Sequence, residues 1–160
     1  MAIQVGEKLP SATLKVPTAD GIQDRSTEQL FTGKKVVLFS VPGAFTPTCS
    51  AKHLPGFVQN AAAIKAKGVD AIICLAVNDA FVMGAWGKDQ QVGDKVIMAA
   101  DGNGEFARAL GLDFDGARFG MGQRSQRFAL IAEDGIVKHL AVEAPGKFEV
   151  SSAEAVLAKL

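Results

Sequence analysis

The chain has 160 residues, 48% of them hydrophobic and 21% charged, and its 17 Lys and Arg side chains balance its 17 Asp and Glu side chains. This composition is typical of a globular protein, and the length predicts one domain over residues 1–160. Because the formal charge is zero and the cations are spread along the chain, we expect no binding to nucleic acid or to an anionic membrane surface. No apolar stretch is long enough to span a bilayer and no secretion signal opens the chain, so we expect a soluble cytoplasmic protein.

A strand and a short helix are predicted first. Residues 12–16 alternate between apolar and polar side chains, which is typical of an edge strand. Ser26 and Gln29 have the spacing of a capping box, so a helix should begin there and end near Phe31.

A parallel strand–helix–strand unit follows. The runs Lys34–Val41 and Val69–Val77 are almost continuously apolar, the pattern of strands that are covered on both faces. Residues 48–67 carry apolar side chains along one side of a predicted helix, and Pro55 should kink it. A strand, a helix and a strand in this order predict a right-handed crossover between parallel strands.

The second half predicts shorter elements. Asn78 or Asp79 can cap a helix that runs to about Trp86. A strand is expected at residues 96–100, and a helix at residues 105–110 that Gly111 would close.

A hairpin and a last helix complete the predicted fold. Residues 127–132 and 136–142 flank Asp134-Gly135, a strong hairpin signal, and Ser151 with Glu154 predicts a capped helix that runs to the C-terminus. The element order predicts an α/β protein with a thioredoxin-like fold, in which helices flank a central mixed β-sheet.

Two cysteines carry the candidate chemistry. With no C-x-x-C motif and no clustered ligands, Cys49 and Cys74 predict neither a disulfide scaffold nor a metal site, and we expect no cofactor. Cys74 lies within an apolar run and is expected to be buried. Cys49 follows a proline-bounded loop at a predicted helix start, where unpaired N–H groups and a partial positive charge favour an anion. Cys49 is therefore predicted to be a reactive thiolate.

A reactive cysteine could serve as a thiol protease, in disulfide exchange, in phosphate transfer or in the reduction of a peroxide. A thiol protease needs a histidine base, and only His53 and His139 are available. His53 lies one helical turn beyond Cys49, where it could act as a base or pack at the rim of the pocket. His139 lies in the middle of a predicted strand. The glycines and arginine of a cysteine phosphatase are absent, and Thr46 occupies the position that disulfide exchange would give to a cysteine.

Peroxide reduction needs groups that are present. Hydrogen bonds to both peroxide oxygens lower the barrier, and the Thr46 hydroxyl and the backbone N–H groups around Cys49 can supply them. A fixed cation must hold the thiolate, and Arg127, which opens a predicted strand, is the candidate. Position alone leaves three other cations open: Arg124, Arg118 and Lys52.

These residues resemble a known family. Pro42, Thr46 and Cys49 have the spacing Pro-x-x-x-Thr-x-x-Cys, which resembles the active-site signature of the peroxiredoxins, and the whole segment is similar to the type II (peroxiredoxin-5-like) form. Five further segments are also similar to that subfamily, in its plant and bacterial branch: His53–Phe57, Val77–Val82, Ala85–Gly87, Arg124–Phe128 and Phe148–Glu154.

The resemblance spans nearly the whole chain and implies a thioredoxin-like fold and a thiol peroxidase. It implies that Cys49 attacks the hydroperoxide and becomes a sulfenic acid. Thr46 would polarise the peroxide, Arg127 would be the cation of the pocket, and Pro42 would form the wall that shields the sulfur.

The resemblance also implies a homodimer joined near the active-site loops, with Phe45, Trp86 and residues 119–121 at the contact. Phe45, His53 and Phe119 are expected at the pocket rim. Phe45, Phe119 and Met121 can give the pocket an apolar mouth that admits alkyl hydroperoxides as well as hydrogen peroxide.

A second thiol must reduce the sulfenic acid. Animal members of the family carry a further cysteine near the C-terminus, and residues 150–152 of this chain contain none. Cys74 is a candidate resolving thiol, but a disulfide with Cys49 needs α-carbons within about 7 Å and local unwinding of the helix start. We therefore favour an external thiol acting in trans, from glutathione with glutaredoxin or from thioredoxin.

Two functions of other classes stay open. A peroxide sensor or redox relay would use the same Cys49 without sustained turnover. A binding or chaperone module would carry Cys49 incidentally, and Cys49→Ser would then be harmless.

Overall fold

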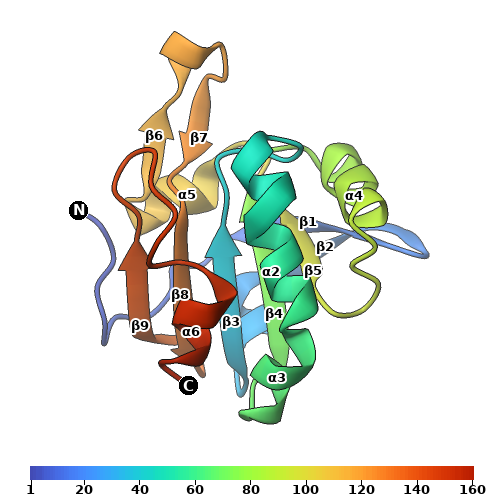
Figure 1. Ribbon diagram of the computed structural model, residues 1–160. Coiled ribbons are helices and arrows are strands. Elements are labelled where there is room, and N and C mark those ends of the chain that lie inside the picture. Colours follow the sequence, from blue (N-terminus) through green and yellow to red (C-terminus); the bar gives the residue numbers. More distant parts are fainter.

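The computed structural model describes residues 1–160 and contains a seven-stranded mixed sheet in the order β2-β1-β5-β4-β3-β8-β9 (Figure 1). Its strands are β1 Thr13–Thr18, β2 Gly21–Ser26, β3 Lys35–Ser40, β4 Ala71–Ala76, β5 Ile97–Ala100, β8 Phe128–Glu133 and β9 Ile136–Val142. The α-helices are α1 Thr27–Phe31, α2 Leu54–Gln59, α3 Ala61–Ala66, α4 Ala80–Asp89, α5 Glu105–Leu110 and α6 Ala153–Leu157. This architecture confirms the predicted thioredoxin-like α/β fold.

The centre of the sheet is parallel, as the two apolar runs predicted. β4 lies between β3 and β5, with Cys74 opposite Phe39 on one side and Met98 on the other. The side chains of β3 and β4 are almost entirely buried because helices cover both faces of the sheet.

Two hydrophobic clusters lie on opposite faces of the sheet. Val37 and Phe39 point to the face that α2, α3, α4 and α6 cover, whereas Val36 and Leu38 point to the face of α1 and α5. In Figure 1, α2, α3 and α6 lie in front of the sheet and α5 lies behind it. Each fully buried large apolar side chain contributes about 1.5–3 kcal/mol.

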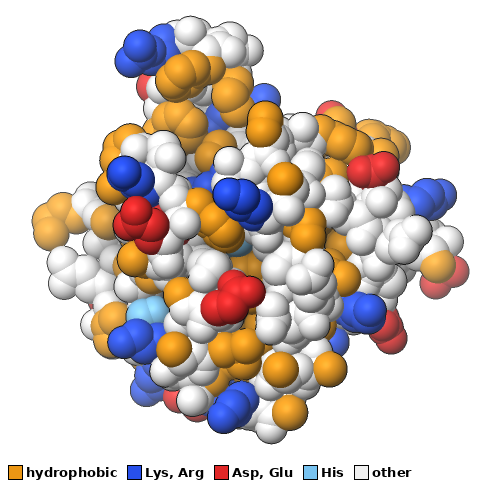
Figure 2. Space-filling model, in the orientation of Figure 1, with side chains coloured by type: hydrophobic (Ala, Val, Ile, Leu, Met, Phe, Trp, Pro, Cys, Tyr) orange, Lys and Arg blue, Asp and Glu red, His pale blue; other side chains and the backbone are white.

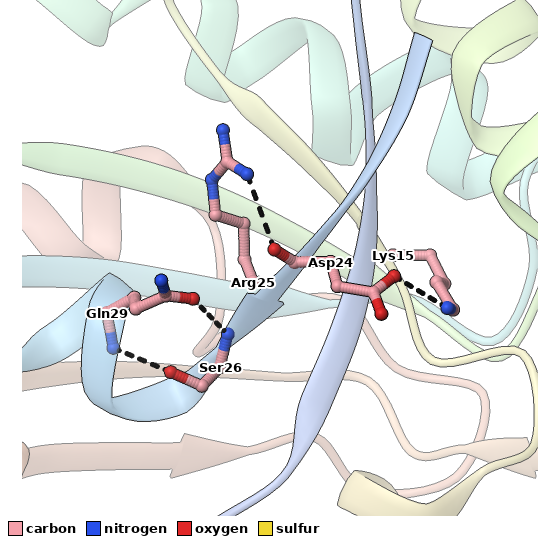
Figure 3. Close-up of polar contacts among 5 residues, drawn as sticks. All are labelled: Lys15, Asp24, Arg25, Ser26 and Gln29. Atoms are coloured by element: carbon pink, nitrogen blue, oxygen red, sulfur yellow. Dashed lines mark hydrogen bonds and ion pairs between the residues drawn. The ribbon is translucent and has the colours of Figure 1, made fainter.

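The predicted edge strand lies one position inside the edge. β1 pairs with β5 on one side and with β2 on the other, so β2 is the true edge. The sequence did not predict β2 because its exposed, polar side chains lack a buried apolar alternation. An exposed ion pair joins the strands, with Lys15 Nζ 2.6 Å from Asp24 Oδ1 (Figure 3).

The start of α1 follows the prediction. The Gln29 N–H donates to Ser26 Oγ at 3.1 Å, and the Ser26 N–H donates to Gln29 Oε1 at 2.8 Å, which completes the capping box (Figure 3). The Arg25 guanidinium donates to the Asp24 carbonyl just before this cap.

The long helix predicted over residues 48–67 is interrupted. Cys49–His53 form a π-helical turn, in which the Leu54 N–H donates to the Cys49 carbonyl, and α2 begins directly after it. Pro55 lies in the first turn of α2. Because the helical backbone continues from the π-helical turn into α2, Pro55 offers no N–H to the carbonyls of the preceding turn. The sequence predicted a kink at Pro55, and the structure has a π-helical turn just before it, which widens the helix around Cys49.

The C-terminal helix begins one residue later than predicted. The side chain of Ser152, rather than Ser151, accepts from the Ala155 N–H at 3.1 Å, and α6 ends at Leu157. No capping box with Glu154 forms, because the Ser151 hydroxyl donates to Glu143 instead. The β8–β9 hairpin is confirmed, and both Asp134 and Gly135 have positive φ angles, 51° and 77°, at its turn.

A short hairpin arm was not predicted. β6 Asp113–Asp115 pairs with β7 Gln123–Ser125, and the segment between them projects from the molecule at the top of Figure 1. No helix has both the length and the apolar character needed to cross a membrane.

Candidate active site

Cys49 lies where β3 leaves the sheet, after the loop that begins at Pro42. Its side chain is fully buried. Two hydrogen bonds shape the loop: the Ala44 N–H donates to Asn78 Oδ1 at 2.9 Å, and the Thr46 hydroxyl donates to the Gly43 carbonyl at 2.7 Å. The sequence predicted Asn78 or Asp79 as a helix cap. Asp79 caps α4, and Asn78 holds the cysteine loop.

The π-helical turn is anchored to α4. The Trp86 Nε1–H donates to Ser50 Oγ at 3.0 Å, next to Cys49. Trp86 is fully buried, so its side chain does not reach a partner surface in the way the sequence suggested. No backbone carbonyl accepts from the Cys49 N–H, which is therefore left free at the helix start.

Arg127 is the cation that contacts the sulfur. Its Nη2 donates to Cys49 Sγ at 3.0 Å. The contact follows from strand register, because Phe128 pairs with Ser40 and Arg127 therefore lies beside the end of β3, where the cysteine loop begins. A hydrogen bond from a charged donor stabilises the thiolate form of the sulfur.

The other three candidate cations have different surroundings. Arg124 donates through Nε to the Met121 carbonyl at 2.8 Å and through Nη1 to the Pro42 carbonyl at 3.5 Å, which ties the arm to the cysteine loop. Arg118 lies over the Phe119 ring on the arm, and Lys52 is exposed.

His53 lies beneath Arg127 and not at the pocket rim. The imidazole is fully buried, and its Nδ1 is 2.7 Å from Arg127 Nη1. Three aromatic rings pack around it, with centroids 4.9–5.6 Å from the imidazole: Phe39, Phe57 and Phe148. The expectation of a rim position was wrong. The spacing from Cys49 predicted that His53 lies one turn further along the helix, but it could not show that this side chain points into the core.

The partners of His53 define its tautomer. A guanidinium can only donate, so Nδ1 must accept from Arg127 and carries no proton. A carbonyl can only accept, so Nε2 must donate to the Ser151 oxygen, 2.9 Å away. Burial, together with the Arg127 charge, lowers the pKa of His53 to about 3. His53 is thus neutral at physiological pH, and no hydrogen bond joins it to Cys49, which argues against a role as the base for this thiol.

A buried carboxylate organises the loop that follows β9. Glu143 accepts hydrogen bonds from the N–H groups of Glu149, Val150 and Ser151 and from the Ser151 hydroxyl, at 2.7–3.0 Å. Burial raises the pKa of Glu143, but the Ser151 hydroxyl and the three N–H groups outweigh it, so the pKa is below the usual value. The role of Glu143 was not predicted from the sequence. Its signal was an acidic residue directly after a mainly apolar strand.

Cys74 lies within the same hydrophobic cluster as Cys49, and both thiols are free. Cys74 is fully buried in β4, and burial raises the pKa of its thiol well above the ordinary value. No cluster of three or more His, Cys, Asp or Glu side chains lies close enough to hold a metal ion.

Three phenylalanine side chains are exposed to solvent, one each on the cysteine loop, α4 and the arm. Phe45, on the loop, is 52% exposed and has a φ of 63°, an uncommon value for a bulky residue. Phe81 on α4 is 78% exposed, and Phe119 on the arm is 65% exposed. Figure 2 shows hydrophobic side chains on the arm and across the upper end of the molecule toward α4.

The chain is similar to known proteins over almost its whole length. A family model described as Redoxin matches residues 4–157. The chain is 50% identical over 159 residues to Peroxiredoxin-2B of Arabidopsis thaliana, a match that covers 99% of this chain and 98% of that protein. It is 53% identical over 163 residues to the chloroplastic Peroxiredoxin-2E-2 of Oryza sativa subsp. japonica, covering 99% of this chain and 72% of that protein.

A solved structure is similar over almost its whole length. The reduced Prx3 of Vibrio vulnificus in complex with hydrogen peroxide is 54% identical, with a TM-score of 0.94 and 98% of each chain covered. The fold and the relatives together define a thiol-dependent peroxidase with an antioxidant role. The chain belongs to the Redoxin family and, within it, to the type II peroxiredoxins, which confirms the resemblance seen in the sequence.

Proposed function

We propose that the Cys49 thiolate reduces hydrogen peroxide and alkyl hydroperoxides. The sulfur attacks one peroxide oxygen, the S–O bond forms as the O–O bond breaks, and the leaving oxygen takes a proton to become water or an alcohol. Cys49 is left as a sulfenic acid. The observation that carries this proposal is the 3.0 Å hydrogen bond from Arg127 Nη2 to Cys49 Sγ. A fixed guanidinium there favours the thiolate and can also stabilise negative charge on the leaving oxygen.

The neighbouring groups support the same reaction. The hydroxyl proton of Thr46 is held by the Gly43 carbonyl, so the Thr46 oxygen is left to accept from a hydroperoxide O–H. The free Cys49 N–H can donate to a peroxide oxygen. We assign Pro42 to the pocket wall and Phe45 and Phe119 to its rim. The hydrogen peroxide bound to the Vibrio vulnificus relative supports hydrogen peroxide as a substrate.

We also propose that an external thiol reduces the sulfenic acid, from glutathione with glutaredoxin or from thioredoxin. The burial of Cys74 in the middle of β4 supports this, because a resolving thiol must reach Cys49 as a thiolate. The exposed Phe45 and Phe119 support a homodimer that covers this face. Two free cysteines in one chain are consistent with a reducing compartment such as the cytoplasm.

The test is steady-state peroxide consumption by the wild type, Cys49→Ser and Cys74→Ser, each with glutathione plus glutaredoxin and with a thioredoxin system. We expect Cys49→Ser to be inactive and Cys74→Ser to retain turnover with at least one system. If Cys74→Ser loses turnover but still forms the sulfenic acid, Cys74 is the resolving thiol. An active Cys49→Ser protein would refute the assignment of the nucleophile.

The alternative function is a peroxide sensor or redox relay, which rests on the same Cys49–Arg127 contact. It predicts one oxidation per chain and no sustained turnover with either reducing system, whereas the proposed peroxidase turns over many times.

A further inference from the structure

A continuous series of hydrogen bonds links the loop after β9 to the Cys49 sulfur. Glu143 holds Ser151 through the Ser151 N–H and hydroxyl, both within 2.8 Å. The Ser151 carbonyl accepts from His53, His53 accepts from Arg127, and Arg127 donates to Cys49. In each of these hydrogen bonds only one of the two groups can donate, so the orientation of each side chain depends on that of its neighbour in the series.

Packing alone does not explain His53. Its ring packs against three phenylalanine rings, surroundings that by themselves favour an apolar side chain. Burying an imidazole is costly unless both nitrogens find partners. Both do, and one of the partners is the guanidinium that contacts the reactive sulfur.

We propose that His53 and Glu143 are positioning residues of the peroxidase site, which act through Arg127. In this role, His53 Nδ1 holds Arg127 Nη1 so that Nη2 remains on the sulfur. Glu143 holds the Ser151 carbonyl, which in turn keeps the imidazole in the Nε2–H tautomer. The inference rests on the proposed role of Cys49 as the nucleophile.

His53 is neutral near pH 7, so replacing it removes no charge from the site. Arg127 contacts the Cys49 sulfur, His53 lies on the same π-helical turn as Cys49, and the buried Cys74 thiol belongs to the same hydrophobic cluster. A change in the pH profile of Cys49 after substitution of His53 therefore reports a displaced Arg127 guanidinium.

Two substitutions separate the acceptor from the packing. In His53→Asn, the side-chain Oδ1 is bonded to Cγ, as Nδ1 is, and can still accept from Arg127. His53→Leu fills a similar volume and has no acceptor. Ser152→Ala is the matched control, because it removes the cap of α6 next to Ser151 without touching the series of hydrogen bonds.

The experiment measures two rates on reduced protein: single-turnover reaction with hydrogen peroxide, and alkylation of Cys49 by iodoacetamide as a function of pH, in a Cys74→Ser background. For His53→Leu we expect peroxide reaction slower by about 10- to 100-fold, the scale of a misplaced catalytic group, and an alkylation midpoint at higher pH. His53→Asn should recover most of both losses, and Ser152→Ala should change neither.

Glu143→Gln tests the series of hydrogen bonds from its other end. If His53→Leu fails to fold, this variant alone tests whether the series positions Arg127. A glutamine NH2 in place of a carboxylate oxygen would face N–H donors, so the loop and the Ser151 carbonyl should shift. We expect slower peroxide reaction and a higher alkylation midpoint here too. Wild-type profiles in folded His53→Leu or Glu143→Gln would overturn the proposal, as would equal losses in Ser152→Ala.

Alkylation does not require peroxidase activity. If the wild type consumes no peroxide, the proposed function fails, but the alkylation profiles still show whether His53 and Glu143 position Arg127 against Cys49.

Discussion

Acid should destabilise this protein through His53, because the fold holds that imidazole neutral where the unfolded chain would protonate it. The pKa of His53 falls from an ordinary 6.5 to about 3 on folding, with burial as the main cause and the Arg127 charge as the second. For a base whose pKa is lowered by folding, the unfolded chain binds more protons below the ordinary pKa. Stability is therefore complete above pH 6.5 and falls as the pH drops toward 3.

The size of the effect follows from these two pKa values. At pH 7 the imidazole is mostly neutral in both the folded and the unfolded chain, so His53 changes the unfolding free energy little. At pH 5 the unfolded imidazole is almost fully protonated while the folded one is not. The loss of unfolding free energy between these two pH values is about 2 kcal/mol. Glu143 adds a further loss of stability at lower pH. Folding lowers the pKa of its carboxyl from the ordinary 4.5, so the stability that it contributes is lost as the pH falls below that value.

Urea unfolding of the reduced wild type and of His53→Asn, at pH 7 and at pH 5, measures this pH-dependent loss of unfolding free energy. The contributions of other groups, including Asp101 and His139, are common to both proteins and cancel in the comparison. The wild type should lose about 2 kcal/mol more than His53→Asn between the two pH values. Equal losses in the two proteins would show that His53 is not held neutral by the fold.

Three further substitutions have defined outcomes. Arg127→Gln should slow the single-turnover peroxide reaction by about 100-fold or more, since a cation is lost from the sulfur, and a wild-type rate would remove Arg127 from the site. Gly111→Ala should lower the melting temperature more than Gly33→Ala: both glycines have a φ near 70°, but a Cβ at Gly111 would lie 2.3 Å from the Met1 carbonyl oxygen, and one at Gly33 meets nothing within 4 Å. Asp79→Ala should cost about 1 kcal/mol in urea unfolding, because the N-terminal N–H of α4 at Val82 loses its acceptor; an unchanged midpoint would contradict this.

Features with a strong local pattern could be predicted from the sequence. The apolar runs of β3 and β4 and the turn residues Asp134-Gly135 required no knowledge of distant residues. The same is true of the capping box of α1. β2 was missed because an exposed edge strand needs no apolar alternation, and the short β6–β7 arm carries no periodic signal.

The placement of Cys49 was also a local matter. A cysteine after a proline-bounded loop, at the start of a helix, was recognisable without the fold, and so was Thr46 three residues earlier. The π-helical turn at Cys49–His53 was not, because the sequence indicates only that Pro55 interrupts a helix.

The identity of the groups around the sulfur was decided by the tertiary structure. Arg127 is 78 residues from Cys49 in the chain, and the antiparallel pairing of β8 with β3 selects it over Arg124, which the same segment offers. The burial of His53 and its contact with Ser151, 98 residues away, depend on how the loop after β9 packs against the π-helical turn. Periodicity and capping act within a few residues, whereas a hydrogen bond between distant segments forms only once the packed sheet brings them together.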